Sequence, residues 1–231
     1  MSCGVIKSVQ QITGYHGTNR ERGETILENG EMKRSEGDKH WLGDGSYLFK
    51  DEFWAYKWIV DMYKERYNED ITSQKLSVKY QVLKIKAETN IDRIFDLDKA
   101  RHRVIFEKII DEICDSKKES NRYKDYKILD GVAINYLFNE FDGFKQKFDV
   151  VKARFVFENY TSNCHNSKTR LNHLPQVQYC IKNLDVIENI NDYDYEEDMD
   201  YYEFVCKRFF NRKESVSTYI PNATGNNIYK E

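Results

Sequence analysis

The chain has 231 residues, a length that suits one α/β or α+β domain. Hydrophobic residues make up 40% of it and charged residues 32%, a balance that is typical of a globular protein and excludes bulk disorder. The formal net charge of −3 neither requires nor excludes a polyanionic partner, and no apolar run approaches the ~18 residues of a membrane span.

A short strand and a helix are predicted first. Residues 10–15 lead into Tyr15-His16-Gly17-Thr18, where we expect the strand to end at a turn. Thr18 or Asn19 can then cap a helix over residues 20–29, because both side chains accept hydrogen bonds from the first turn of a helix. The pair Asn29-Gly30 predicts the end of this helix, since glycine readily adopts the left-handed conformation of a C-cap.

A glycine turn, a strand and a second helix follow. Within residues 40–49, Gly43 and Gly45 bracket an aspartate, and residues 46–49 have the composition of a strand. The next stretch places aromatic and apolar residues at helical spacing, namely Phe53, Trp54, Tyr56, Trp58 and Met62.

The rest of the chain mixes strands and helices. Residues 77–87 alternate apolar and polar side chains, as a half-buried strand does, and residues 150–158 and 176–187 are predicted to be further strands. Residues 97–115 and 128–141 are predicted to be helical, the first with an apolar stripe of Val104, Ile105, Ile109, Ile110 and Ile113. We therefore expect an α+β fold.

One domain and an extension are expected from the distribution of charge. Residues 1–190 contain the predicted strands and helices and form the expected domain. Residues 191–231 are acidic and aromatic at first, then basic and aromatic, and are expected to pack on this domain or to trail from it.

The cysteines and the first residues indicate the compartment. The five cysteines are scattered without a CxxC pair, so we expect reduced thiols and neither a disulfide framework nor a zinc site. The nearest approach to a metal site, Cys164-His165 with His173, lacks ligand spacing. Because the start also lacks the apolar stretch of a signal peptide, we expect a cytoplasmic protein with no membrane partner.

Three distant segments carry the residue types of a ligand site. His16 lies at a predicted strand end, and by itself such a histidine is more often a structural hydrogen-bonder. Tyr47 follows the glycine turn, where it can present its ring to a planar ligand or pack in the core. Gln176 and Gln178 point to the same side of a strand, and a solvated face is the simpler interpretation of that pair alone.

Taken together, these segments resemble the ADP-ribosyltransferases of the diphtheria-toxin and poly(ADP-ribose) polymerase type. That family carries a histidine on the first core strand, a tyrosine after a glycine turn, and a glutamate or a substitute on a late strand. The resemblance rests on YHGT (15–18), GDGSYLF (43–49) and QVQYCIKN (176–183), which occur in the family's order. It implies a split mixed or antiparallel β core flanked by helices, with NAD⁺ as co-substrate and no metal.

The resemblance also implies a role for each matching residue. His16 would hold the adenosine-side ribose of NAD⁺, Gly17 would bind the nicotinamide carboxamide through its backbone, and Thr18 would support that turn. Tyr47 would stack on the nicotinamide ring. Trp58 would be a second aromatic contact, with Trp54 as the alternative, and core packing is an equally good interpretation of Trp58 alone.

Two departures from the family pattern affect the expected chemistry. Ala55 stands where many relatives place a serine against the carboxamide, which removes one hydrogen bond worth about 0.5–1.5 kcal/mol. Gln178 stands where a glutamate would stabilise the positive charge that develops at the anomeric carbon. A neutral amide can orient the ribose but supplies no counter-charge, so a single transfer is expected and polymer synthesis is not.

The acceptor of ADP-ribose and the biological role stay open between several alternatives. Residues 122–127 and 207–213 interleave basic and aromatic side chains as single-strand binders do, although a solvated helix face is the simpler interpretation. The resemblance includes compact toxins, which places a nucleic acid such as messenger RNA slightly ahead of a protein acceptor. It also suggests a toxin–antitoxin or phage-defence role with a cognate antitoxin as partner. An NAD⁺ glycohydrolase and a non-catalytic module with a degenerate NAD⁺ pocket are the remaining alternatives.

Overall fold

A computed structural model describes residues 8–37, 40–68, 71–119, 129–156 and 174–209 of the protein. Its strands are β1 (Val9–Asn19), β2 (Ser46–Phe49), β3 (Tyr80–Asn90), β4 (Ile94–Asp96), β5 (Val150–Phe155), β6 (Gln176–Ile181) and β7 (Ile187–Tyr193). Its helices are α1 (Arg20–Asn29), α2 (Glu52–Tyr67), α3 (Ser73–Lys79), α4 (Ala100–Glu119), α5 (Leu129–Glu140), α6 (Asp142–Lys147) and α7 (Met199–Phe209).

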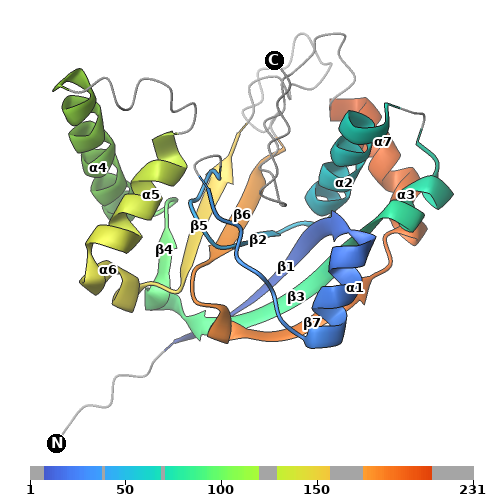
Figure 1. The fold of residues 1–231 in the computed structure, drawn as a ribbon, viewed down its shortest axis with the longest axis horizontal. Coiled ribbons are helices and arrows are strands. Elements are labelled where there is room, and N and C mark those ends of the chain that lie inside the picture. Colours follow the sequence, from blue (N-terminus) through green and yellow to red (C-terminus); the bar gives the residue numbers. More distant parts are fainter. Residues whose placement is uncertain (1–7, 38–39, 69–70, 120–128, 157–173, 210–231) are drawn as a thin grey trace, which may run out of the picture.

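The strands form one mixed seven-stranded sheet, which helices flank on both sides (Figure 1). The strand order is β4-β5-β6-β2-β1-β3-β7, in which β4 and β5 run parallel and the other neighbours antiparallel. This architecture agrees with the predicted mixture of strands and helices around a mixed β core.

The sheet has two well-paired halves with a narrow junction between them. β1 pairs with β3 along all eleven of its residues, and β2 pairs with β6 along all four of its own. Between β1 and β2, by contrast, the register contains one pair, Tyr15 opposite Phe49. Two strands that share so little of a ladder leave room between them for side chains, and the candidate site lies at this junction.

Three apolar clusters hold helices against the sheet. The first joins α2, α3 and α7 to the β1-β3 half, on the right in Figure 1, and the second joins α4, α5 and α6 to β4, β5 and β6 on the left. The third joins α1 to the opposite side of the sheet, because successive residues of a strand face opposite ways. Val82 and Leu83 on β3 illustrate this, since they belong to the first and third clusters respectively.

The first predicted helix is confirmed, but the turn predicted before it is wrong. Asn19 is the N-cap of α1, with its side chain accepting from the Arg22 amide at 2.8 Å, and Gly30 ends the helix at φ +68°. Strand β1 does not stop at residues 15–18. Its ladder with β3 continues to the pair of Asn19 with Tyr80, so the chain passes directly from strand to helix.

Two later predictions are corrected in their bounds. Residues 77–79 belong to α3, whose first turn is capped by the Thr72 hydroxyl, and the strand begins at Tyr80. The single strand predicted over 176–187 is two strands, because Asn183 caps a short 3-10 turn between β6 and β7.

The boundary that separates the predicted domain from its extension, at residue 190, falls inside β7. The buried Tyr202 of α7 belongs to the same apolar cluster as α2.

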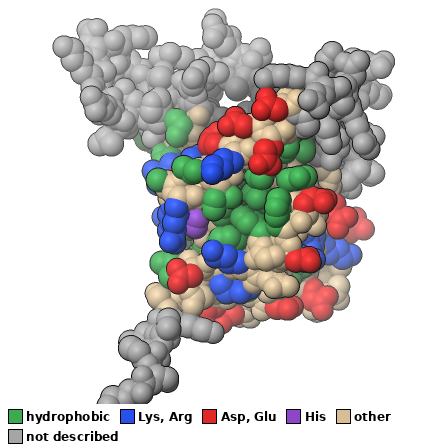
Figure 2. Space-filling view, turned by 90° about the vertical axis from the view of Figure 1, so that its left-hand side faces the viewer, with side chains coloured by type: hydrophobic (Ala, Val, Ile, Leu, Met, Phe, Trp, Pro, Cys, Tyr) green, Lys and Arg blue, Asp and Glu red, His purple; other side chains and the backbone are tan. Residues whose placement is uncertain are grey.

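The apolar stripe predicted on α4 is buried in part only. Ile109 and Ile113 face the core, whereas Val104 and Ile105 are exposed. Figure 2 shows the side of the molecule that lies on the left in Figure 1, where hydrophobic side chains gather between charged ones. The helical region on this side also carries exposed Tyr136 and Phe141.

Candidate functional site

A pocket lies at the junction of the two half-sheets. Its cavity volume is about 40 Å³, several times what one water molecule requires. It is lined by residues from β1, β2, α2, β6 and the segment before β2, namely His16, Gly17, Ser35, His40, Tyr47, Phe49, Trp58 and Gln178. The pocket therefore brings together the three segments on which the resemblance rests.

Gly17 allows α2 to approach β1 closely. A Cβ atom at this position would lie 2.8 Å from the Ala55 carbonyl oxygen, 2.8 Å from Cγ2 of Ile59 and 3.0 Å from Cε3 of Trp58. Real Cβ atoms do not approach backbone oxygens so closely, so a side chain here would push the helix away. The glycine thus sets the distance between the strand and the half-buried Trp58 ring.

The two tryptophans of α2 have different surroundings. Trp58 lines the pocket. Trp54 is 3% exposed, and its Nε1 donates to the Pro175 carbonyl oxygen at 3.2 Å, which fixes it in the core. Of the two alternatives from the sequence, Trp58 is therefore the one beside the pocket.

His16 lines the pocket and has a ring nitrogen without a hydrogen-bond partner among the described residues. Its Nδ1 lies 2.8 Å from the carbonyl oxygen of Tyr47, which can only accept, so Nδ1 carries the proton. Nε2 is then an acceptor, and it is buried without a hydrogen-bond partner among the described residues. Burial lowers the pKa of His16 to about 4, against a smaller opposing effect of the bond to Tyr47, so the ring is neutral at pH 7.

Tyr47 is fixed by both roles of its hydroxyl group. The hydroxyl donates to the Gly43 carbonyl oxygen at 2.6 Å and accepts from the Leu42 amide at 2.8 Å. Burial is the largest cause that raises the pKa of Tyr47 well above its usual value. The phenol therefore stays protonated and holds its ring against the glycine turn that precedes it.

The same turn is pinned from two other elements. Asn135 of α5 accepts from the Asp44 amide through Oδ1 at 2.7 Å. Lys182, just after β6, donates from Nζ to the carbonyl oxygens of Leu42 and Asp44 at 2.7 and 2.6 Å. These contacts make residues 40–45 a fixed wall of the pocket.

His40 is a pocket residue that the sequence did not predict. Its Nε2 donates to the Glu36 carbonyl oxygen at 3.2 Å, so Nδ1 is an acceptor, and Nδ1 is buried without a hydrogen-bond partner within the described part of the chain. Burial is the largest cause that lowers the pKa of His40. Its ring centroid lies 5.6 Å from that of Tyr47.

Ser35 and Phe49 also line the pocket without having been predicted. Phe49 stands two residues after Tyr47 on β2, and this period-2 spacing is the sequence signal that places both on one face. Ser35 reaches the pocket through a backbone bridge to Gly45, with both amide–carbonyl bonds at 2.9 Å. That pairing has no signal in the sequence.

Gln178 lies inside the protein, so a solvated face for Gln176 and Gln178 is wrong. The two side chains are 8% and 4% exposed, and Nε2 of Gln178 donates to Oε1 of Gln176 at 2.7 Å. The reason is that this face of β6 packs inward, since Cys180 on the same face belongs to the second apolar cluster.

Thr18 does not line the pocket. It is 1% exposed and lies toward α1, where a Cβ atom on Gly23 would be 3.2 Å from its Cγ2. Since β1 continues through this position, there is no turn for Thr18 to support. The predicted turn at Thr18 is therefore replaced by a strand.

The described lining is uncharged at neutral pH. It contains two neutral imidazoles, an amide, a serine hydroxyl and three aromatic rings, and the lining residues given above include no carboxylate. Over the described ranges, no three histidine, cysteine, aspartate or glutamate side chains are grouped to hold a metal ion. Residues 122–127, Cys164, His165 and His173 lie outside the described residues, as do residues 210–213.

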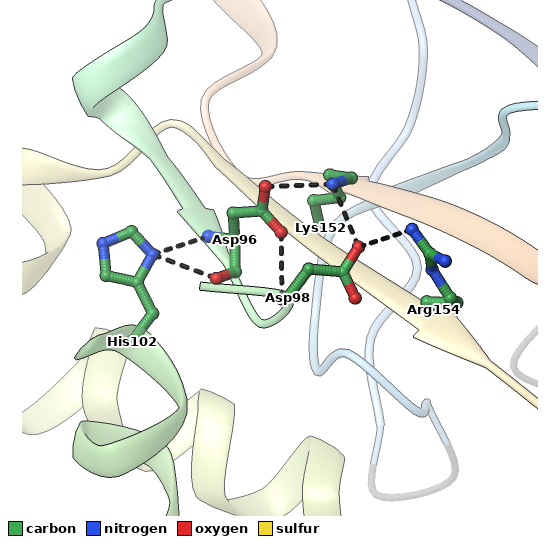
Figure 3. A network of polar contacts seen from close by, with 5 residues as sticks. All are labelled: Asp96, Asp98, His102, Lys152 and Arg154. Atoms are coloured by element: carbon green, nitrogen blue, oxygen red, sulfur yellow. Dashed lines mark hydrogen bonds and ion pairs between the residues drawn. The ribbon is translucent and has the colours of Figure 1, made fainter. Parts of the chain in front are cut away.

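A network of charged groups near β4 is built differently (Figure 3). Lys152 donates to Asp96 and Asp98 at 2.9 and 3.2 Å, and Arg154 lies 3.3 Å from Asp98. His102 accepts from the Asp96 amide through Nδ1 at 2.9 Å. Each of these charges has a partner of opposite sign, so the network links β4 to β5.

Comparison with known proteins shows a relative from an archaeon. The chain is similar to a protein of Methanocaldococcus jannaschii, named uncharacterized protein MJ0359, with 35% identity over 204 residues that cover 84% of this chain and 92% of the relative. No family model matches the chain, and no solved structure matches it. Within the described residues, no helix is long and apolar enough to cross a membrane.

Proposed function

The chain belongs to the family of the Methanocaldococcus jannaschii protein, and from its pocket we propose that it is a mono-ADP-ribosyltransferase. It would split NAD⁺ at the nicotinamide bond and pass ADP-ribose to a macromolecule. The observation that supports this most is the common pocket of His16, Gly17, Tyr47, Trp58 and Gln178. Four of these residues belong to the three segments on which the resemblance rests, and Trp58 belongs to the helix that follows the second segment.

The lining suits the nicotinamide end of NAD⁺. The rings of Tyr47 and Trp58 give flat apolar surfaces, and an electron-rich aromatic face attracts a cationic pyridinium ring. The neutral His16 adds no repulsion to that cation, and its bare Nε2 can accept a hydrogen bond from a ribose hydroxyl. Gly17 also lines the pocket, and its backbone is the group that would bind the carboxamide.

The reaction needs orientation more than proton transfer. The bond between C1 of the ribose and the pyridinium nitrogen breaks with its electron pair passing to nitrogen, so nicotinamide leaves as a neutral molecule. The sugar then has oxocarbenium character, as in glycoside hydrolysis. The acceptor attacks C1, and the proton that it loses passes to solvent. The residues of the pocket hold the ring and the ribose in line for this step.

Gln178 limits what the pocket can add to this step. Its amide is committed to Gln176 through Nε2, and it offers the sugar a neutral oxygen where a carboxylate would offer a negative charge. This observation favours a second candidate, a module that binds NAD⁺ without cleaving it. For the first candidate it supports a single slow transfer.

The acceptor and role that we propose follow from the resemblance. A nucleic acid, with messenger RNA as one form, comes ahead of protein, and the protein would act as the toxin of a toxin–antitoxin or phage-defence system. A cognate antitoxin is then the expected partner.

One experiment separates these candidates. The protein is incubated with NAD⁺ labelled in the adenylate part and with cell lysate, and nicotinamide release is measured in parallel. Label on macromolecules supports transfer, and its loss to nuclease or to protease identifies the acceptor class. Free ADP-ribose alone means hydrolysis, binding without nicotinamide release means a non-catalytic module, and the absence of NAD⁺ binding overturns the proposal.

A further inference from the structure

We propose that His40 is a second ligand-binding residue of the pocket, whose Nδ1 accepts a hydrogen bond from the nicotinamide riboside half of the bound nucleotide. The pocket would then select a ligand that brings it two hydrogen-bond donors, one for His16 and one for His40. This inference rests on the proposed function, since it assumes that the ligand is NAD⁺.

The two imidazoles are arranged alike. Each one has a ring nitrogen fixed by a backbone carbonyl oxygen, Nδ1 of His16 by Tyr47 and Nε2 of His40 by Glu36. A carbonyl oxygen accepts only, so each fixed nitrogen is the donor and the tautomer of each ring is set. The opposite nitrogen of each ring is therefore an acceptor.

Both acceptors are buried and unmatched. His16 is 8% exposed and His40 is 3% exposed, and Nε2 of the first and Nδ1 of the second have no hydrogen-bond partner among the residues that the structure describes. A buried polar atom without a partner destabilises the protein, because it has lost its hydrogen bonds to water. Two such atoms in the lining of one pocket indicate a ligand that completes them.

The position of His40 is held from outside the pocket. A Cβ atom on Gly131 of α5 would lie 1.7 Å from the His40 carbonyl oxygen, so the helix packs directly on its backbone. The Gly43 amide donates to the same oxygen at 3.2 Å. His40 thus lines the pocket from a fixed backbone, with its ring beside that of Tyr47, which is the ring proposed to contact nicotinamide.

Two kinds of neutral group in the ligand are able to donate to His40. The nicotinamide carboxamide offers an N–H group and the adjoining ribose offers hydroxyl groups, and either can donate to an imidazole nitrogen. A carboxylate in the same place would bring acceptors only, and its oxygens would repel the lone pair of the His40 Nδ1 atom. The pocket is thus expected to discriminate between an amide and an acid at the end of the ligand.

A pair of matched substitutions tests this. His40→Gln keeps a donor near Nε2 for the Glu36 carbonyl but removes the acceptor at Nδ1, whereas His40→Asn keeps an acceptor near Nδ1 and removes that donor. Binding of NAD⁺ is measured by calorimetry for the intact chain and both variants, with thermal unfolding as the check on folding. We expect about tenfold weaker binding for His40→Gln, the effect of one lost hydrogen bond, and binding within about twofold of the original for His40→Asn.

The outcomes of this test are distinct. Equal binding by all three proteins, or weaker binding by His40→Asn, overturns the role of His40 and leaves the proposed function in place. Failure of the unsubstituted protein to bind NAD⁺ overturns the proposed function, and this inference with it.

The source of the donor is identified by two analogues. Nicotinic acid adenine dinucleotide lacks the carboxamide donor, and an analogue of NAD⁺ with a 2′,3′-dideoxyribose on the nicotinamide side lacks both hydroxyl donors. The analogue that weakens binding to the unsubstituted protein but not to His40→Gln lacks the group that His40 contacts. If both analogues weaken binding to both proteins equally, His40 contacts neither group and the inference is overturned.

Discussion

The pocket and the cluster around Asp149 both bury polar groups beside the sheet, but they differ in whether those groups have hydrogen-bond partners. Asp149 is 3% exposed, and its carboxylate accepts from Thr89 at 2.7 Å, from Asn183 at 3.2 Å, and from both Nε and Nη2 of Arg93. Burial alone would raise the pKa of Asp149, but these hydrogen bonds outweigh it and lower the pKa. In the pocket, His16 and His40 each keep an acceptor without a partner.

This difference separates polar groups that stabilise the fold from groups that are kept ready for a ligand. The Asp149 cluster is complete, and it ties the end of β3 to the start of β5 and the end of β6. The pocket is incomplete, so its histidines are expected to lower the stability of the empty protein and to contribute only when a ligand binds. The four predictions below test that separation, from the largest expected effect to the smallest.

Asp149→Ala is expected to destabilise the protein most. The substitution leaves Thr89 and Asn183 without their acceptor and Arg93 without its counter-charge, and removal of one partner of a buried pair costs about 3–5 kcal/mol. Because the Arg93 side chain is 41% exposed and can reach water, we expect about 3 kcal/mol. Urea unfolding measures this value.

The matched control for Asp149 comes from the network in Figure 3. Asp98 is paired to Lys152 and Arg154, but its side chain is 30% exposed, so Asp98→Ala is expected to cost about 1 kcal/mol or less. NAD⁺ binding by the folded fraction of both variants should be unchanged. Equal losses of stability for the two substitutions would remove the distinction between a buried, complete cluster and an exposed one.

His16 is expected to make the free energy of unfolding depend on pH. The unfolded chain takes up a proton on this residue as the pH falls below about 6.5, while the folded protein does so only near pH 4, so the free energy of unfolding decreases across this window. The full loss below pH 4 is about 3 kcal/mol from this residue. His16→Gln does not titrate, so the pH dependence of its stability should be shallower between pH 6.5 and 4. Parallel curves for the two proteins would mean that His16 is not held neutral.

Gly17→Ala tests the close approach of α2 to β1. Its Cβ atom would meet the Ala55 carbonyl oxygen at 2.8 Å, so α2 must move, and overpacking of this kind costs about 1–3 kcal/mol. We also expect weaker NAD⁺ binding, because Trp58 moves with the helix. Gly143→Ala on α6 is the control, since a Cβ there meets nothing within 4 Å and alanine favours a helix. Equal stability of the two variants, measured by urea unfolding, would show that the approach is not tight.

Local sequence signals predicted the helices and strands well, but they did not predict which polar atoms of the pocket lack a partner. The capping Asn19 and the C-terminal Gly30 act within their own helix, so the bounds of α1 followed from the sequence. Helix α3 has seven residues, and its Ser77-Val78-Lys79 end alternates like a strand, so the pattern before β3 was ambiguous. A seven-residue helix depends on tertiary packing, here of its buried Leu76, more than on its own propensity.

The residues of the pocket divide in the same way. Gly17, Tyr47 and Gln178 were found through motifs within short segments. His40 was missed because its free Nδ1 depends on the Glu36 carbonyl and on the packing of α5, which no pattern around residue 40 encodes. The burial of Gln176 was missed for a similar reason, since the cluster on this face of β6 is built by residues from distant parts of the chain.

His16→Asn is expected to have the smallest effect on stability and a clear effect on binding. The asparagine amide can keep the donor to the Tyr47 carbonyl oxygen, while the acceptor at Nε2 is lost. Binding of NAD⁺ should weaken about tenfold, as for one hydrogen bond, and the free energy of unfolding of the empty protein should change by less than about 1 kcal/mol. His16→Gln, which places a polar group near Nε2, should recover part of the binding. If His16→Asn instead loses stability as Asp149→Ala does, the histidine is a completed part of the fold, and its nitrogen is not waiting for a ligand.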